Sequence, residues 1–554
     1  MKAGTKPSLL FLPLGGAGEI GMNLNLYGYG PPGEERWIMV DLGVTFGDGD
    51  PPGVDVIMPD PTFIVDRRDQ LDGLVLTHAH EDHLGAVQYL WDRLRCPIYA
   101  TPFTANLLRS KLREANLLDA VPLTEVPLSG RFSIGPFDLE LITLTHSIPE
   151  PNAIAIRTPL GTVLHTGDWK FDPDPVIGPT ADEKALRALG EDAVLAMVCD
   201  STNVFEAGTS GSEADLLETL REQISSCEGR VAVTCFASNV ARLETISEAA
   251  RACKRDVVIA GRSLRRIELA ARSCGYLKDT PAFIEESDSG YLPKDRTLVI
   301  CTGSQGEPRA ALWRIATNKH PNVTMGAGDT VIFSSRIIPG NEISISRLHN
   351  QLIRRGINVV TPRDAFIHVS GHPARDELSR MYGLVRPRIA VPVHGELRHL
   401  VEHGRLAKTC QVPQAVVTEN GGLVRLAPGD AEVIDTVSTG RLYLEGKRLV
   451  ATGSTIFKER VRAIHNGVMI ISVVVDEDGL VDDPLIETFG LLEEADIDVE
   501  DSIFNAVAKT IEDMRPKIRR DDAALREAVR IVARRVVRDR LDKKPETRVS
   551  IFRA

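Results

Sequence analysis

The sequence predicts an α/β protein with three parts: a sandwich domain, a second α/β domain inserted into it, and a small α+β domain at the C-terminal end. From Leu9 to about Thr202, short apolar runs end in Gly, Asp or His, which is typical of strands that alternate with loops. Between roughly Phe205 and Ala365, helical and strand segments alternate, and after Gly371 the first pattern returns. A pattern that stops and then resumes indicates an inserted domain.

The chain of 554 residues is longer than a single hydrophobic core supports, so several domains are expected. We place the sandwich domain at 1–205 and 371–450, the inserted domain at 206–370, a linker at 451–462 and the C-terminal domain at 463–554. In the inserted domain, periodicity predicts helices over 213–227 and 239–252 and strands over 230–235, 257–259, 297–301 and 330–333. For the C-terminal domain, we expect an apolar strand (VMIISVVV), two amphipathic helices and a short strand (RVSIF). Core or interface positions at helical spacing are Leu525, Val529, Val532 and Val536.

Composition narrows the class of protein. A hydrophobic fraction of 43% and a charged fraction of 26% are ordinary for a globular protein and exclude wholesale disorder. No run reaches the roughly 18 apolar residues of a membrane span, and the first apolar run is too short for a secretory signal. We therefore expect a cytoplasmic protein without membrane attachment. The eight cysteines are scattered and contain no C-x-x-C pair, so we expect reduced core thiols.

The net charge of −12 argues against indiscriminate nucleic-acid binding, because proteins that bind phosphates broadly carry a basic excess. It does not exclude a nuclease. Two bound divalent cations and a local basic groove can attract a polyanion to an acidic molecule.

A dense cluster of metal-binding residue types follows the apolar run that ends at Leu76. The segment T-H-A-H-E-D-H-L-G supplies His78, His80, Asp82 and His83 within six residues. Alternate side chains of an extended loop share a face, so His78 and His80 can bind one ion while Asp82 and His83 face a second. A surface loop with incidental histidines would be an unusual source of such density.

Three further candidates end apolar runs elsewhere in the chain: His146, Asp168 and His394. Strand ends that meet at one edge of a sandwich would bring them to the histidine-rich loop. We expect His78, His80 and His146 on one ion, Asp82, His83 and His394 on the other, and Asp168 between them. Imidazole and carboxylate without thiolate suit zinc, with manganese or magnesium as alternatives.

Other residues near these motifs are expected to support the site or to lie outside it. Asp41 ends the run WIMV, where it could accept a hydrogen bond from a ligating histidine or simply close a turn. We expect a packed structural role for His165. For His399 and His403, on a helix after the last ligand, we expect solvated positions.

Together, HAHEDH, THSIPE, HTGDWKFD and PVHGE resemble the motifs of the metallo-β-lactamase superfamily, with its αββα sandwich. The segment DSTN at 200–203, FASN at 236–239, HVSGH at 368–372 and the strand before His394 resemble its β-CASP branch, and within it bacterial ribonuclease J. The resemblance covers essentially the whole chain. It implies a metallo-β-lactamase domain with an inserted β-CASP domain and a small α+β C-terminal domain.

The resemblance also implies roles for residues outside the metal cluster. His372 would act near the scissile phosphate as a general acid or transition-state stabiliser, and Asp200 would orient it, so that Asp82, His372 and Asp200 are the catalytic candidates. The substrate-binding candidates are Ser238, Asn239, His368, Ser370, Gly371 and His372. For the serines, turn chemistry is the alternative. Asp48, Asp50 and Glu445 could hold an accessory structural cation, although an acidic turn such as GDGD is common at surfaces.

The mechanism expected from these residues is hydrolysis of RNA. Two cations about 3.5–4 Å apart would bring the pKa of a bridging water towards neutrality, and the hydroxide would attack phosphorus in line. A pocket for a 5′-monophosphate would direct 5′-to-3′ exonuclease action, and RNA that bypasses it would be cut internally. Messenger RNA decay and ribosomal RNA maturation are the expected processes, and the expected assembly is a homodimer or homotetramer. The C-terminal domain would then be a dimerisation element, or alternatively a cap over the core domain.

Three rival functions remain. A small-molecule hydrolase of the same fold would not need the inserted domain or the HVSGH turn. A related β-CASP DNA nuclease cannot be distinguished by these motifs. An RNA-binding scaffold with a dead site is at odds with the complete ligand set.

Overall fold

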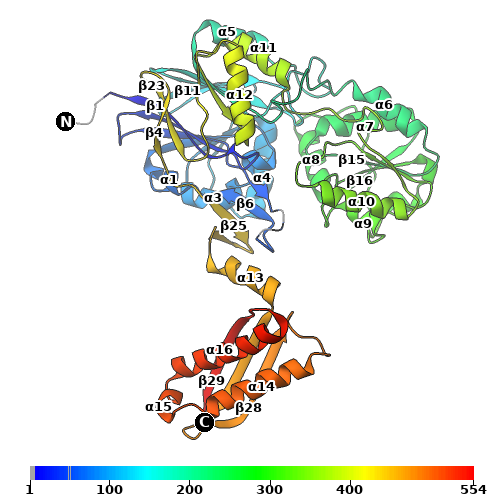
Figure 1. Ribbon diagram of the computed structural model, residues 1–554. Coiled ribbons are helices and arrows are strands. Elements are labelled where there is room, and N and C mark those ends of the chain that lie inside the picture. Colours follow the sequence, from blue (N-terminus) through cyan, green and yellow to red (C-terminus); the bar gives the residue numbers. More distant parts are fainter. Residues whose placement is uncertain (1–5, 48, 50) are drawn as a thin grey trace. The chain divides into compact units, whose positions relative to one another are not determined.

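Two β-sheets face each other in the first unit of the computed structural model, which describes residues 6–47, 49 and 51–554 (Figure 1). The first sheet has the order β24 (Glu432–Thr436), β23 (Gly422–Ala427), β1 (Ser8–Gly15), β3 (Leu24–Gly30), β4 (Arg36–Val40), β7 (Leu71–Val75), β8 (Ile98–Ala100), β9 (Leu123–Glu125). The second sheet has the order β10 (Arg131–Ile134), β11 (Phe137–Thr143), β12 (Asn152–Thr158), β13 (Gly161–His165), β14 (Val194–Asp200), β20 (Ile389–Val393), β22 (Gln414–Ala415). Two short pairs join β2 (Ala17–Gly18) to β21 (Gly395–Glu396), and β5 (Thr45–Phe46) to β6 (Val56–Pro59).

The core of the sandwich lies between the two sheets. Phe11 and Ile38 from the first sheet pack with Ile154 and Val391 from the second in one buried cluster. Because strand side chains alternate between faces, Trp37 points away from this core and meets Phe63, with the ring centroids 5.5 Å apart. Helices α1 (Thr62–Val65), α3 (Val87–Leu94) and α4 (Pro102–Glu114) lie beside the first sheet (Figure 1).

A second buried cluster covers the outer face of the second sheet. It contains apolar residues of α5 (Glu183–Glu191), α11 (Arg375–Val385) and α12 (Leu397–Thr409), which pack on Met197 and Ala390. The order of layers is therefore helix, sheet, sheet, helix. The predicted αββα sandwich is confirmed.

The inserted domain leaves the sandwich after β14, and the chain returns through α11 to β20, the strand hydrogen-bonded beside β14. Its parallel sheet has the order β16 (Asp256–Ala260), β17 (Thr297–Cys301), β15 (Val231–Thr234), β18 (Thr330–Phe333), β19 (Asn358–Val360). Its helices are α6 (Leu216–Ser225), α7 (Val240–Ala252), α8 (Arg262–Ser273), α9 (Ala311–Ala316) and α10 (Glu342–Arg354). The predicted helices and strands of this domain agree with these bounds to within a few residues at each end.

The second unit comprises residues 47–55 and 442–554. It contains the hairpin of β25 (Arg441–Glu445) and β26 (Arg448–Ala451), then α13 (Thr455–Asn466), β27 (Val468–Val475), β28 (Leu480–Phe489), α14 (Ile497–Glu512), α15 (Pro516–Arg519), α16 (Asp522–Leu541) and β29 (Glu546–Arg553). Strand β27 pairs antiparallel with β28 and parallel with β29, and α14 and α16 pack on one face of this sheet. Leu525 and Val529 are fully buried there, while Val532 and Val536 are partly buried against the same core.

Two differences from the expected C-terminal domain have physical causes. Helix α13 occupies most of the segment expected as a linker, and Ser454 caps it by accepting a hydrogen bond from the amide of Ile456. Strand β28 was not expected, because Asp482, Asp483 and Pro484 interrupt its apolar alternation.

Two expectations from composition can be compared with the described part of the chain. Within these residues, no helix has the length and apolar content that a membrane crossing requires. All eight cysteines are free thiols, four buried and four partly exposed.

Candidate metal centre

The predicted ligands meet because the strands that carry them end at the same edges of the two sheets. In the second sheet, β13, β14 and β20 run parallel, so Asp168, Asp200 and His394 follow neighbouring strand ends. Strand β11 runs antiparallel to β12 and therefore ends at this edge too, three residues before His146. In the first sheet, β4 and β7 are parallel and end together at Val40 and Val75.

The histidine-rich loop is held against the strand end at Asp41 by backbone contacts. The amide of Leu42 donates to the carbonyl of His83 (2.7 Å), and the amide of Asn23 donates to the carbonyl of Asp82 (2.9 Å). A Cβ atom at Gly43 would lie 1.7 Å from the Asp82 carbonyl oxygen, so only glycine allows this approach. The loop is thereby fixed before any ion binds.

The first predicted ligand set forms a tight cluster of ring nitrogens. His80 Nδ1 lies 3.0 Å from His78 Nε2 and 3.1 Å from His146 Nε2. Ligands bound tetrahedrally at 2.0–2.1 Å stand about 3.3 Å apart, which is close to these separations. The three rings are therefore spaced as ligands of one ion.

The second predicted set is equally close. Asp82 Oδ2 lies 3.2 Å from His394 Nε2 and 3.6 Å from His83 Nε2. Asp168 Oδ2 lies 3.1 Å from His83 Nε2. The same oxygen lies 3.9 Å from His78 Nε2 and 3.8 Å from His146 Nε2, so the Asp168 carboxylate stands between the two sets.

The outer ring nitrogens fix the tautomers of the histidines. His83 donates from Nδ1 to Asp41 Oδ2 (2.7 Å), and His146 donates from Nδ1 to the carbonyl of Gly371 (2.5 Å). Thr77 gives its hydroxyl proton to Asp41 (2.8 Å) and so accepts from His78 Nδ1 (3.0 Å). These donations point each Nε2 at the cluster, which is the ring orientation that metal-bound imidazole requires.

Thr202 fixes the tautomer of His394 in the same way. Its hydroxyl donates to Asp200 Oδ1 (2.7 Å) and accepts from His394 Nδ1 (2.8 Å). His394 itself has a φ of 53°, a left-handed conformation that is uncommon for a residue with a side chain.

Two observations show that this donor set suits metal ions. Oδ1 of Asp168 is buried and has no hydrogen-bond partner among the described residues. Nε2 of His78 and Nε2 of His146 both face Nδ1 of His80. That nitrogen carries at most one proton, so it can donate to only one of the two rings. A buried cluster with such unmet acceptors is stable when cations occupy it.

The protonation of the histidines also favours cations. Burial lowers the pKa of His80 to about 4 and places those of His78 and His146 well below their usual value, so all three are neutral at pH 7. Burial likewise lowers the pKa of His83, but the carboxylates of Asp168 and Asp82 outweigh it and raise that pKa well above its usual value. The second set thus attracts positive charge strongly.

The expected pair of His372 and Asp200 lies beside the cluster. His372 donates from Nδ1 to Asp200 Oδ2 (2.8 Å), and its ring stacks on that of His394 with centroids 5.6 Å apart. Burial lowers the pKa of His372, while Asp200 and Asp168 raise it to a net value above the usual one. Its Nε2 atom is therefore free to carry a proton beside the ligands.

The predicted phosphate-binding residues have different surroundings. Ser370 is half-buried and accepts hydrogen bonds from Asn203 Nδ2 (2.8 Å) and from the amide of His372 (3.2 Å). Gly371 uses its carbonyl to hold His146. Nδ1 of His368 lies 3.5 Å from a terminal nitrogen of Arg242. Ser238 is half-buried in the turn that precedes α7.

Asn239 uses its side chain within the protein. Its Oδ1 atom caps α7 by accepting from the amide of Arg242 (2.9 Å), and its Nδ2 atom donates to Glu213 Oε1 (3.2 Å). Asn239 is buried, and its proposed contact with substrate stays a prediction.

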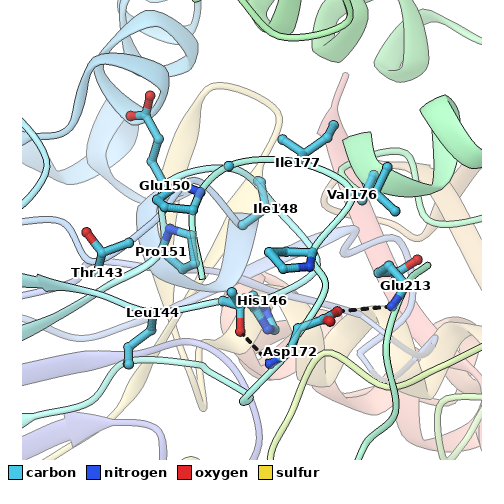
Figure 2. A pocket seen from close by; sticks show the side chains of 15 residues that line it. Thr143, Leu144, His146, Ile148, Glu150, Pro151, Asp172, Val176, Ile177 and Glu213 are labelled. Atoms are coloured by element: carbon cyan, nitrogen blue, oxygen red, sulfur yellow. Dashed lines mark hydrogen bonds between the residues drawn. The ribbon is translucent and has the colours of Figure 1, made fainter. Parts of the chain in front are cut away.

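A small cavity lies behind His146, lined by Leu144, Ile148, Asp172 and others (Figure 2). Its volume of about 20 Å³ has room for one water molecule. Asp172 closes one side by accepting a hydrogen bond from the amide of Glu213 (3.0 Å). This cavity is too small to be the substrate site.

Four family models match the chain in succession. Residues 26–226 match the metallo-beta-lactamase superfamily, and residues 228–352 match the model "Ribonuclease J, beta-CASP domain". Residues 356–415 match "Zn-dependent metallo-hydrolase RNA specificity domain", and residues 455–554 match "Ribonuclease J C-terminal domain". A protein from Sinorhizobium meliloti named Ribonuclease J is 46% identical over 546 residues, 98% of this chain and 97% of that protein.

This chain belongs to the ribonuclease J family. Two further ribonuclease J proteins are similar to it. The one from Mycolicibacterium smegmatis is 41% identical, covering 83% of this chain and 82% of its own. The one from Thermus thermophilus is 34% identical, covering 87% of this chain and 85% of its own. A solved structure of a protein of unknown function from Enterococcus faecalis V583 has a TM-score of 0.50 at 16% identity, covering 76% of this chain and 100% of that one, which shows the fold alone.

The ribonuclease J family comprises metallo-β-lactamase/β-CASP nucleases, and the buried histidine and aspartate cluster of this member could bind metal. The structure adds Thr77, Thr202 and Asn203, which contact Asp41, His394 and Ser370 and were not predicted as site residues. Their neutral side chains have no metal-binding signature. Only their position beside a ligand motif, TH at 77–78 and DSTN at 200–203, could have indicated a role.

Several other expectations have mixed outcomes. Asp41 contacts His83 as predicted, and His165 is packed against Tyr27, whose hydroxyl lies 2.9 Å from Nδ1. The expectation that His399 and His403 are solvated is wrong, because both are buried. His403 is hydrogen-bonded to Ser201 (2.8 Å) and Tyr382 (2.9 Å) on the side of α12 that faces the core, and His399 packs edge-on against Phe205.

The accessory cation site stays a prediction. Asp48 and Asp50 lie outside the described residues. Glu445 accepts hydrogen bonds from both terminal nitrogens of Arg460, at 2.7 and 3.1 Å.

Proposed function

We propose that this protein is a metal-dependent ribonuclease that removes nucleotides from the 5′ end of RNA and also cuts RNA internally. The observation that carries the proposal is the meeting of seven ligand side chains beside the His372–Asp200 pair. The match to an RNA specificity domain and the relatives named Ribonuclease J support RNA rather than DNA or a small molecule as the substrate.

In this proposal, His78, His80 and His146 hold one divalent cation, Asp82, His83 and His394 hold the other, and Asp168 is shared. When bound, the two cations withdraw charge from the phosphodiester and lower the pKa of the attacking water. Zinc fits the imidazole-rich donors best, with manganese or magnesium as alternatives.

The His372–Asp200 pair supplies the proton chemistry. Asp200 keeps the proton of His372 on Nδ1, so Nε2 can hold a second proton near the leaving oxygen. Donation of that proton to the 3′ oxygen gives a 3′-hydroxyl on one product and a 5′-phosphate on the other.

Ser238, Asn239, His368, Ser370 and Gly371 are proposed to form a pocket for the 5′-monophosphate. His372 follows Ser370 by two residues, so a phosphate held at Ser370 places the next phosphodiester near the catalytic pair. RNA that does not use the pocket would be cut internally. We further propose that the enzyme works in messenger RNA decay and ribosomal RNA maturation in the cytoplasm, as a homodimer or homotetramer.

The first test is the double variant Asp82→Ala, His83→Ala. We expect cleavage of RNA to fall to background and metal content to fall below two ions per chain, with the circular dichroism spectrum retained. The control is Asp138→Ala, His465→Ala, which makes the same changes at exposed positions. Undiminished cleavage by the purified double variant at 82 and 83 would refute the metal site.

The second test compares one RNA that carries a 5′-monophosphate, a 5′-triphosphate or a 5′-hydroxyl, with DNA of the same sequence as a further substrate. The pocket predicts the fastest decay for the monophosphate. Equal rates for all three RNAs would remove the pocket, and equal cleavage of DNA would remove the preference for RNA.

A further inference from the structure

Asn203 occupies the boundary between the sandwich and the inserted domain, where its amide makes three hydrogen bonds. It is 3% exposed and follows β14 by three residues. Its Nδ2 atom donates to Ser370 Oγ (2.8 Å) and to the carbonyl of His372 (3.0 Å), and its Oδ1 atom accepts from Arg336 (2.8 Å). No role has been assigned to Asn203 or Arg336 in the site described above.

The orientation of this amide is settled by its partners. Arginine has only donors, so the atom that faces Arg336 must be the oxygen. The carbonyl of His372 can only accept, so the atom that faces it must be the nitrogen. Both constraints give the same orientation, and Ser370 Oγ therefore receives a proton from Asn203.

The hydroxyl of Ser370 is restricted as a result. Its oxygen accepts from Asn203 Nδ2 and from the amide of His372, which uses both lone pairs. Only its own proton is left, and in the described part of the chain no acceptor receives it. Ser370 can therefore act towards a ligand only as a donor.

We infer that Asn203 is a positioning residue that makes Ser370 a hydrogen-bond donor to the 5′-phosphate of the substrate, and that Arg336 holds Asn203 in this state. The inference rests on the proposed phosphate pocket. A phosphate offers only acceptors and is charged, so it gains more from a fixed donor than a neutral 5′-hydroxyl does.

Arg336 connects this arrangement to the inserted domain. It lies in the loop after β18, and its second terminal nitrogen donates to Glu206 Oε1 (2.8 Å). The planar guanidinium thus contacts Asn203 and Glu206 from two separate terminal nitrogens, a fixed geometry that the single ammonium of a lysine does not provide. The hydrogen bonds from Arg336 to Asn203 and from Asn203 to Ser370 cross between the inserted domain and the sandwich. The Ser370 hydroxyl is therefore oriented only when both domains are folded against each other.

The test is the substitution Asn203→Asp in the full chain. The new carboxylate can only accept, so the proton of Ser370 turns towards it and away from the substrate. The readout is the ratio of kcat/KM for 5′-monophosphate RNA to kcat/KM for 5′-hydroxyl RNA. We expect this ratio to fall roughly 10–100-fold, which corresponds to the loss of one hydrogen bond to a charged group. Any disturbance of His372 slows both RNAs and cancels in the ratio.

Ser370→Ala and the double variant complete a double-mutant cycle. Ser370→Ala should also lower the ratio, and adding Asn203→Asp to it should lower the ratio no further. The matched control is Asn106→Asp, which changes another asparagine that donates to a serine hydroxyl, Ser273 (3.1 Å), at an exposed contact. It should leave the ratio unchanged.

Each outcome decides a different point. If Asn203→Asp lowers the ratio equally with and without Ser370, it acts by its charge alone and the inference is overturned. If Ser370→Ala lowers the ratio but Asn203→Asp does not, the inference is likewise overturned while the phosphate pocket survives. If Ser370→Ala has no effect, the pocket itself is wrong. Should Asn203→Asp fail to fold, Arg336→Met provides a second test, because it removes the hydrogen-bond donor to Asn203 Oδ1. An unchanged ratio in this variant would again overturn the inference.

Discussion

Replacing Asp41 with asparagine is expected to weaken the second cation more than the first, because Asp41 contacts His83 directly and His78 only through Thr77. Asp41 is fully buried and accepts three hydrogen bonds: from the amide of Thr77 (2.8 Å), from the hydroxyl of Thr77 (2.8 Å) and from His83 Nδ1 (2.7 Å). An amide has one oxygen and one NH₂ group, so it cannot replace both carboxylate oxygens.

The two possible orientations of the new side chain both fail. If its oxygen faces the Thr77 amide, its NH₂ group meets His83 Nδ1, and the proton of His83 must move to Nε2, where it blocks the metal. If the amide is reversed, its NH₂ group opposes the N–H of Thr77. Either way one hydrogen bond of a charged group is lost, about 1.5–3 kcal/mol. This corresponds to roughly 10–100-fold in the affinity of the ion that His83 binds, the usual range for such supporting residues.

Titration of the metal-free protein with zinc against a competing chelator would measure the affinity of each ion. Wild-type protein should bind two ions, and in the variant the ion of the His83 set should weaken by about one to two orders of magnitude, more than the ion of the His78 set. Asp182→Asn is the matched control, because Asp182 caps α5 and asparagine caps helices equally well. Two unchanged affinities in a folded Asp41→Asn variant would refute the derived tautomer of His83.

Three further expectations follow from the same geometry. Gly371→Ala would place a Cβ atom 2.8 Å from the ring of His146, so the first ion should weaken at least tenfold in the same titration, and an unchanged affinity would contradict the contact. Zinc at 100 times its dissociation constant should raise the free energy of unfolding by about 2.7 kcal/mol per site, measured by thermal unfolding. In the double variant at positions 82 and 83, the stabilisation that comes from the second site should be lost. Burial lowers the pKa of His403 to about 4, below its unfolded value, so its contribution to stability is complete above pH 6.5 and is lost as the pH falls towards 4. The stability difference between wild type and His403→Gln should therefore shrink by about 3 kcal/mol over that range, whereas exposed His465→Gln should show no such trend.

The candidate metal ligands could be predicted from the sequence because few residue types bind metal ions. His78, His80, His146 and His394 stand after apolar runs, and such runs predict strand ends whose convergence the sandwich then requires. Their assignment to two ions stays a prediction, which rests on the alternation of side chains in the histidine-rich loop and agrees with the position of Asp168 near both sets.

The neutral residues around them were not accessible in this way. Thr202 acts on His394, 192 positions away, and Asn203 acts on Ser370, 167 positions away, so their roles depend on contacts that no local pattern encodes. The error at His403 was different, because a signal existed. Leu400, His403 and Ala407 recur at helical spacing and share the buried face of α12, a pattern that predicts a buried His403.

The supporting contacts explain why a cluster of so many histidines can be specific. Asp41, Thr77, Thr202 and the Gly371 carbonyl differ chemically, yet each holds the proton of one ring on Nδ1. Folding thus sets the orientation of each ring, with Nε2 pointing at the cluster. Because the Gly371 carbonyl and the Ser370 hydroxyl belong to one turn, the same backbone segment sets a metal ligand on one side and the inferred phosphate donor on the other. A shift of this turn would therefore change metal affinity and 5′-end preference together, whereas Asn203→Asp should separate them by altering the preference alone.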